Sequence, residues 1–334
     1  MNMQTRYFLI GLMSWCSLVS ADEGPLTDAV YEQLMAEICA ANTEPVRRQT
    51  TQVFSWTDEN GQVHFGDRPP QAVDAQVETL TGQRDYFDLT IEFADGPTQP
   101  ELANSLEVNG RAIAQAMARL VPKGQMTKSD VQMHVFVSRS GFRSYQRQKA
   151  PALSPQTVGF YSALDNSVAV WHSQNPDLTR EIALHEATHV FQVRNMGMLP
   201  AWLVEGMASY FEKLTVSGQS KQVVVSEQWL GWFRYSGQVL SVEDLLVAQY
   251  QHWQGPQGAA YYAGSWALVY FLMQSEHRAI MEQYLTLVSA EKCDDTPPSE
   301  TLAFFNQAYP GGIATLQTDL LAWLAGPHRV PNYH

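Results

Sequence analysis

His185-Glu186-Ala187-Thr188-His189 is the stretch that decides the fold, and it is followed by Trp202-Leu203-Val204-Glu205-Gly206. The first lies in an apolar helical run from 178 to 193, the second in an apolar-striped segment from 201 to 211. An α-helix has 3.6 residues per turn, so His185 and His189 project from one face, one turn apart. Two imidazoles so placed can approach a single Zn²⁺ at about 2.0–2.1 Å each. The sequence therefore predicts two neighbouring helices that share a metal site.

The two glutamates of these stretches complete the predicted site. Glu186 points to the side of the histidine stripe, where the base of an H-E-x-x-H site reaches a water rather than the metal. A catalytic zinc site takes three protein ligands, and Glu205 is the candidate for the third. The alternative is a helix that carries two surface histidines and a glutamate by chance. We disfavour it because charged side chains inside an apolar run require a reason.

These residues resemble the gluzincin metallopeptidases, the group that holds thermolysin and aminopeptidase N. The HEATH sequence matches the two zinc-binding positions and the base, and Pro200–Glu212 looks like the helix that carries the glutamate ligand. They also look like bacterial envelope proteins classed as zinc peptidases with a peptidase-MA-like domain. The resemblance implies an α+β fold of the thermolysin/aminopeptidase type. Its parts are a small sheet with an edge strand, the H-E-x-x-H helix, the glutamate helix and a C-terminal helical lobe.

The same resemblance implies zinc-dependent hydrolysis of peptide bonds in the cell envelope. One Zn²⁺ per chain is expected on His185, His189 and Glu205, with Glu186 as general base. The expected partner is a peptide or protein substrate. An endopeptidase is weakly preferred because no Gly-x-Met-x-Asn signature for a free amino terminus is present. The sequence makes no prediction of the oligomeric state.

Two further expectations concern the cleft. In gluzincins the strand just before the H-E-x-x-H helix forms the cleft edge, where an extended peptide can add as a strand; Ser167–Trp171 has that place here. In gluzincins a tyrosine or histidine from the C-terminal lobe lies over the zinc and donates to the oxyanion, and in aminopeptidase-like relatives this tyrosine stands just ahead of a helix. Tyr262 fits that pattern, and Tyr261 is the fallback.

The chain departs from the named relatives at two points. Only fifteen residues separate His189 from Glu205, fewer than in either named relative. Gln192 and Asn195 stand where a metzincin has its glycine and third histidine, which excludes an all-histidine site of that kind.

Two other functions remain as alternatives. One is a non-catalytic zinc-containing binding or envelope-assembly protein that has kept the site but lost turnover; the presence of Glu186 favours catalysis over it. The other is a purely structural zinc site, which is disfavoured because such sites are usually closed four-ligand cages rich in cysteine.

Length and charge limit the partners. A chain of 334 residues is long enough for one domain with appendages. Its net charge of −13 argues against nucleic acid and anionic membrane surfaces as partners. No stretch reaches the length of a helix that spans a bilayer, so no stable membrane span is expected.

The N-terminal part carries the signs of export. Residues 1–21 have a positive start, an apolar stretch and a small-residue cleavage site, which predicts a cleavable signal peptide and a periplasmic or secreted protein. Cleavage would remove Cys16 and leave Cys39 and Cys293, either as one disulfide or as two unrelated thiols. Residues 22–52 are expected to form a helix, 26–40, and a linker.

Residues 53–80 are expected to form a small β-hairpin module. Two aromatic and β-branched segments flank Asp58-Glu-Asn-Gly61, a strong hairpin signal because Asn-Gly accepts positive φ. The pattern resembles a small module found after signal peptides in proteobacterial envelope proteins. His64 in it is interpreted as a side chain on a hairpin face rather than a ligand.

The metallopeptidase domain is expected over residues 85–330. Alternation predicts strands at 88–93 and 131–137 and a hairpin of 158–161 with 167–172, and apolar periodicity predicts helices at 101–120 and 141–148. After residue 212 we expect a strand and an aromatic turn over 223–233, then helices at 242–250, from 261 to 272, and on to 324.

Overall fold

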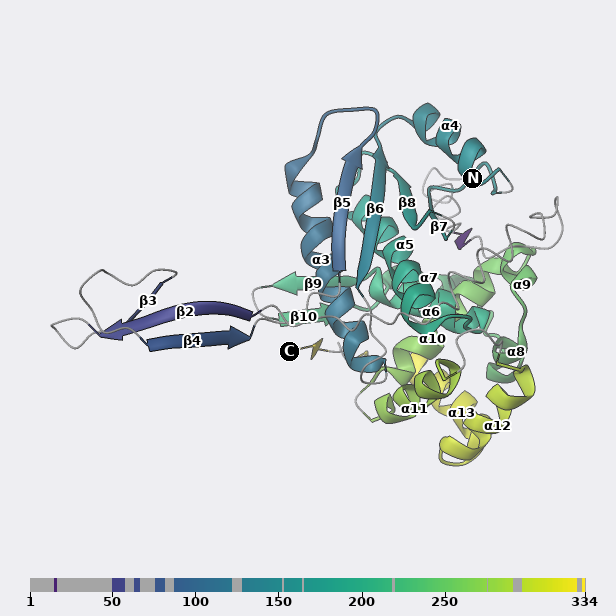
Figure 1. The fold of residues 1–334 in the computed structure, drawn as a ribbon. Coiled ribbons are helices and arrows are strands. Elements are labelled where there is room, and N and C mark those ends of the chain that lie inside the picture. The colour runs from purple at the N-terminus through teal and green to yellow at the C-terminus, as the bar shows by residue number, and fades with distance from the viewer. Residues whose placement is uncertain are drawn as a thin grey trace.

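The computed structural model describes residues 87–121, 128–151, 153–163, 165–217, 220–274, 276–290 and 296–328 with their side chains. It also describes the backbone of the strands at 15–16, 50–57, 63–66, 76–81 and 332–333. A mixed sheet covered by helices is followed by a largely helical region (Figure 1). This confirms the predicted α+β class at that level.

The main sheet has the strand order β7-β8-β6-β5, and the two-residue β1 (Trp15–Cys16) lies beside β7. Strands β5, β6 and β8 are parallel to one another, while β7 runs antiparallel to β8. Parallel neighbours need a long crossover, and helix α3 (Pro100–Leu120) supplies it between the first two. The four long strands are β5 (Phe87–Phe93), β6 (Ser129–Phe136), β7 (Gly159–Ser162) and β8 (Ser167–Trp171).

The order of the strands corrects one expectation. Ser167–Trp171 was expected to form the edge of the cleft, but β8 pairs with β6 on one side and with β7 on the other. The predicted hairpin is present, with its turn at Asn166 in the left-handed region (φ 49°). After this turn β8 lies between β7 and β6, so β7 and β5 are the two end strands of the four.

Helices cover both faces of the sheet. One face packs against α3 and α5 (Pro176–Met196) through a large apolar core that includes Met133 and Val135. Phe136 and Phe160 lie in a smaller cluster with Phe142 of α4 (Arg139–Lys149). The alternation along the strands thus places α5 on one face and α4 on the other.

Local signals explain the two helices that carry the predicted ligands. Asn175 caps α5 by accepting hydrogen bonds from the backbone N–H groups of Asp177 and Leu178, with Pro176 at the first helical position. The helix ends at Gly197, whose φ of 78° favours glycine. After a short connection, α6 (Ala201–Phe211) follows with the predicted bounds, and all its residues are buried.

The region after residue 212 differs in part from the predicted elements. Residues 223–233 were expected to form a strand and a turn, but β10 ends at Val223 and Ser226 caps α7 by accepting from the Trp229 N–H. Helix α10 begins at Gly258, so Tyr262 lies inside it rather than ahead of it. The elements here are β9 (Leu214–Ser217), β10 (Ser220–Val223), α7 (Glu227–Ser236), α8 (Val242–Val247), α9 (Gln251–Gln254), α10 (Gly258–Leu272), α11 (Arg278–Val288), α12 (Pro298–Ala308), α13 (Gly312–Ala325) and β11 (Asn332–Tyr333).

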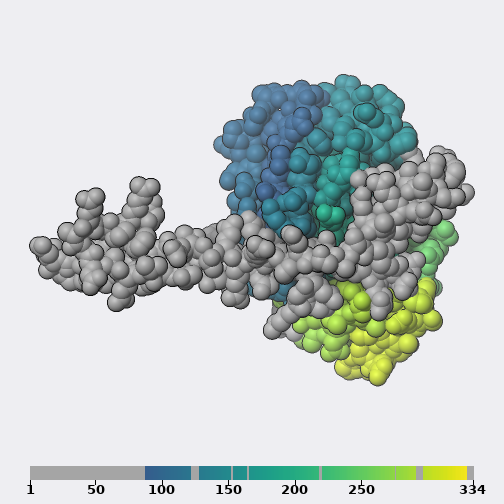
Figure 2. All heavy atoms as spheres, in the orientation of Figure 1, coloured from purple at the N-terminus to yellow at the C-terminus, as the bar shows by residue number. Residues whose placement is uncertain are grey.

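The space-filling view shows how these parts are arranged. The sheet and its helices, coloured blue and teal, form one end of the described body, and the last two helices, coloured yellow, form the other (Figure 2). The helical lobe expected at the C-terminal end is therefore present as a packed unit. Within the described residues, no helix is both long and apolar enough to cross a bilayer.

The N-terminal strands form a separate sheet. Strands β2 (Thr50–Thr57), β3 (Val63–Gly66) and β4 (Gln76–Thr81) are antiparallel in the order β3-β2-β4. Thr57 pairs with Val63 across the predicted turn. The side chain of His64, the helix expected at 26–40 and the pair Cys39 and Cys293 lie outside the described residues.

Candidate metal centre

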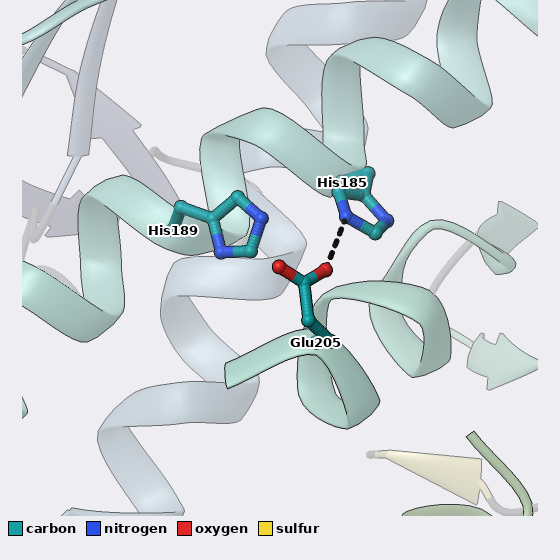
Figure 3. A group of neighbouring side chains, drawn as sticks. All are labelled: His185, His189 and Glu205. Atoms are coloured by element: carbon teal, nitrogen blue, oxygen red, sulfur yellow. Dashed lines mark ion pairs between the residues drawn. The ribbon is translucent and has the colours of Figure 1, made fainter. Parts of the chain in front are cut away.

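Three predicted ligands converge between α5 and α6. His185 and His189 project from successive turns of α5, and Glu205 rises toward them from α6 (Figure 3). One donor atom from each of the three lies within 4.8 Å of the others. The Nε2 atom of His185 is 3.4 Å from Oε2 of Glu205. All three side chains are buried, so water does not compensate their polar atoms.

Partners behind the ligands fix which histidine nitrogen faces the centre. Nδ1 of His185 is 2.9 Å from Oε2 of Glu212, and a carboxylate only accepts, so this nitrogen donates. Nδ1 of His189 is 2.9 Å from Oε1 of Gln192, whose Nε2 donates to the Val204 carbonyl at 3.0 Å. The amide oxygen is therefore the acceptor, and His189 also donates from Nδ1. Both Nε2 atoms are left to face Glu205.

The unsatisfied atoms fit a metal ion. Within the described part of the chain, Nε2 of His185, Nε2 of His189 and Oε2 of Glu205 have no hydrogen-bond partner although they are buried. Buried polar atoms are normally satisfied, so three that face one another call for a ligand. Ligands on a tetrahedral zinc lie about 3.3 Å apart, close to the shortest separation here. Two imidazoles and one carboxylate also leave a fourth position, as in catalytic zinc sites.

Tyr250 holds the other oxygen of the glutamate. Its hydroxyl donates to Oε1 of Glu205 at 2.5 Å, so that Oε2 remains directed at the histidines. Tyr250 lies between α8 and α9, far from both ligand helices in sequence. Every ligand thus has a second contact that sets its orientation, which is the usual construction of a metal site.

Glu186 lies beside the three ligands and is not one of them. Its side chain is fully buried, and neither carboxylate oxygen has a well-formed hydrogen bond within the described residues. A Cβ placed on Gly159 of β7 would lie 3.3 Å from Oε1 of Glu186 and 2.5 Å from Ile182. The carboxylate of Glu186 therefore lies between α5 and β7, and only a glycine at 159 lets β7 approach the helix so closely.

Burial and charge shift the pKa values of all four groups when no metal is bound. Burial raises the pKa of Glu186 to about 8 and lowers that of His189 to about 4. For His185, burial is outweighed by the carboxylates of Glu205 and Glu212, which raise its pKa to about 10. For Glu205, burial is outweighed by the two histidines and Tyr250, and its pKa is lowered. A protonated His185 beside the ionised Glu205 and Glu212 balances part of their negative charge.

A pocket with a volume of about 40 Å³ opens next to His185. Tyr262 of α10 lines it, and its ring stacks on that of Trp229 at 6.4 Å with 9° between the planes. The other tyrosine considered, Tyr261, instead packs its ring 5.0 Å from Trp253. Of the two tyrosines, only Tyr262 shares a pocket with a predicted ligand.

Three residues of the site were missed by the sequence analysis. Glu212 follows Glu205 by seven residues, two helical turns, and that spacing on one face was a readable signal. Gln192 follows His189 by three, the spacing of neighbouring side chains on a helix. Tyr250 has no local signal, because only the tertiary fold brings it to Glu205.

Family models match two separate parts of the chain. Residues 181–293 match DUF1570, described as a protein of unknown function, and residues 49–84 match DUF4124, described as a domain of unknown function. The first match includes all the ligands described above, and the second covers β2, β3 and β4. No curated protein matches the chain.

Proposed function

We propose that the protein is a zinc-dependent peptidase of the gluzincin type that hydrolyses peptide bonds in the bacterial cell envelope. The observation that carries this proposal is the convergence of three unsatisfied donor atoms, from His185, His189 and Glu205, beside the buried carboxylate of Glu186. A structural site would have no use for a fourth, non-ligating carboxylate buried at this position. The resemblance of these residues to gluzincins supports the same conclusion.

The residues suit peptide hydrolysis in distinct roles. When bound, a zinc ion supplies Lewis-acid polarisation of a carbonyl and of a water. Glu186 takes the proton of the attacking water and passes it to the leaving amine, and its burial makes it a stronger base than an exposed glutamate. Glu212 and Gln192 hold the two imidazoles with their Nε2 atoms toward the centre. Tyr262, at the pocket beside His185, is the proposed donor to the oxyanion.

We also propose that the protein is exported, because residues 1–21 have the composition of a signal peptide. The mature protein is then expected outside the cytoplasm with its amino terminus near Asp22. Amino-terminal sequencing checks this, and an exported form that begins at Met1 would refute cleavage.

The deciding experiment joins metal analysis of the purified protein to a peptidase assay on an unfolded protein substrate. We expect about one zinc per chain. The Glu186→Gln variant should bind zinc normally and lose roughly 10²–10⁴-fold in rate, since it lacks the base. If wild type and variant hold zinc and are equally inert, a non-catalytic zinc-containing envelope binding or assembly protein becomes the better proposal.

Ligand variants test the metal site itself. His185→Ala, His189→Ala and Glu205→Ala should each remove most of the zinc, because a three-ligand site has no spare donor. Full zinc content in Glu205→Ala would place the third ligand elsewhere.

A further inference from the structure

The pocket beside His185 has an apolar lining that reaches away from the metal centre. Ile182 and Leu178 lie on the same face of α5 as His185, one and two turns toward its start respectively, and Val158 precedes β7. The stacked rings of Trp229 and Tyr262 complete the apolar lining. A volume of about 40 Å³ holds about three waters, so it admits the end of a side chain and excludes a large ring.

The charges of this pocket do not balance. Glu181 and Glu212 both line it, and none of the lining residues is a lysine or arginine. Glu181 is paired with Nζ of Lys213 at 2.6 Å. Glu212 accepts from His185, and an imidazole that binds a metal through Nε2 is neutral. With a divalent metal offset by Glu186 and Glu205, two carboxylates face a single ammonium, which leaves one negative charge.

Trp229 forms part of the wall of this pocket. The side chain of Trp229 is 3 % exposed, and its indole Nε1–H has no acceptor in the described part of the chain. Leaving such a donor unpaired costs about 1–3 kcal/mol. Trp229 lines the pocket, so a side chain that enters it would pack against this residue.

We propose that this pocket binds the cationic end of a lysine or arginine side chain of the peptide substrate, next to the metal centre. The inference rests on the proposed function and adds its substrate class. The stem of such a side chain would lie along Leu178 and Ile182, and its ammonium or guanidinium group would supply the missing positive charge to Glu181 and Glu212. An acidic side chain would meet two carboxylates and be rejected.

Two hydroxamates test this preference by binding alone. Nα-acetyl-lysine hydroxamate and Nα-acetyl-norleucine hydroxamate share a metal-chelating group and differ only at the end of the side chain. Calorimetry with the zinc-loaded wild type at low salt should show the lysine compound binding at least about tenfold more tightly. The preference should persist in part at high salt, because mostly buried charges are screened less than exposed ones. Equal affinities, or tighter binding of norleucine, would overturn the inference.

Variants of the pocket test whether it causes the preference for the lysine compound over the norleucine compound. Glu181→Gln should abolish the preference for lysine, because it removes one of the two carboxylates that line the pocket and leaves Lys213 without its partner, and Lys213→Met should strengthen it. Glu243→Gln, an exposed position on α8, is the control for net charge and should leave the ratio unchanged. If the ratio of the two hydroxamate affinities changes as much in Glu243→Gln as in Glu181→Gln, the preference depends on net charge and not on the pocket.

A second pair of probes separates this inference from the proposed function. The binding of n-pentylammonium and 1-pentanol, followed by saturation-transfer NMR, requires no metal. If the protein holds no zinc and binds neither hydroxamate, the proposed function fails. Displacement of pentanol by pentylammonium in wild type, but not in Glu181→Gln, would still support a cation-binding pocket. Equal binding of these two probes would refute it.

Discussion

Gln192 joins the two halves of the metal centre through one side chain. Its amide oxygen orients His189, and its amide nitrogen binds the Val204 carbonyl, one residue before Glu205. The Gln192→Ala variant loses both contacts and leaves the buried Nδ1–H of His189 without its acceptor. We expect its zinc affinity to fall about 10–100-fold, the usual cost of losing such a partner. Competition with a chelator measures this, with the exposed Gln238→Ala as control. Unchanged affinity would show that Gln192 is only a packing residue.

Tyr250 and Tyr262 should behave differently when each is changed to phenylalanine. Tyr250 donates to a ligand, so Tyr250→Phe should weaken zinc binding. Tyr262 lines the pocket and is the proposed oxyanion donor, so Tyr262→Phe should keep its zinc and lower kcat by roughly 10²-fold or more with little change in KM. Chelator competition and steady-state kinetics separate the two. A kcat loss confined to Tyr250→Phe, with zinc retained, would move the oxyanion role to that residue.

The buried carboxylate of Glu186 gives the metal-free protein a distinct dependence on pH. Burial raises its pKa from 4.5 to about 8. The stability it contributes is therefore fully present below about pH 4.5 and is lost as the pH rises through 8. Glutamine does not ionise, so in the presence of a chelator Glu186→Gln should melt higher than wild type by a margin that widens from pH 5 to pH 9. The exposed Glu243→Gln should show no such trend. If the difference in melting temperature between Glu186→Gln and wild type does not depend on pH, ionisation of Glu186 does not destabilise the folded protein.

At the scale of elements, local sequence patterns predicted most individual helices and strands but not the order of the strands in the sheet. The alternation in Val131–Val137 and the apolar stripe of Ala201–Phe211 identified β6 and α6, because these periodicities are set by the face that each element buries. The order of β7 and β8 depends on pairing with β6, which alternation does not encode. Residues 223–233 were misassigned because three β-branched residues outweighed the Ser226 cap that begins α7.

The contact between α6 and α10 gives a prediction for a single methyl group. A Cβ on Gly206, next to Glu205, would lie 2.6 Å from the Ser265 carbonyl oxygen and 2.6 Å from Val269. Gly206→Ala should therefore destabilise the protein by about 1–3 kcal/mol through overpacking. Gly231 in α7 has nothing within 4 Å of such a Cβ, so Gly231→Ala should stabilise it by about 0.5–1 kcal/mol. Denaturant melts compare the two, and effects of the same sign would contradict the close contact.

For the whole molecule, the site residues that lie close together in the sequence were predicted. Those that only tertiary packing brings to the site were missed. His185, Glu186 and His189 lie on one helix, and Glu205 lies on the next, so spacing alone was enough to propose them. Tyr250 and the pocket with Trp229 depend on how α7 to α10 pack over α5 and α6. No periodicity in the sequence specifies that packing.

The last prediction concerns the stability of the whole fold. Without a metal, the carboxylates of Glu186, Glu205 and Glu212 are held together in a buried site whose balance depends on one protonated histidine. A ligand that binds only the folded state stabilises it by about 4 kcal/mol when its free concentration is 1,000 times Kd. For a domain of this size that corresponds to roughly 8–16 °C in Tm. A chelator should lower the Tm of the wild type by that order, and added zinc should restore it. Glu205→Ala should melt at a temperature that neither treatment changes. A wild-type Tm that is insensitive to both would show that no metal is bound by the folded protein.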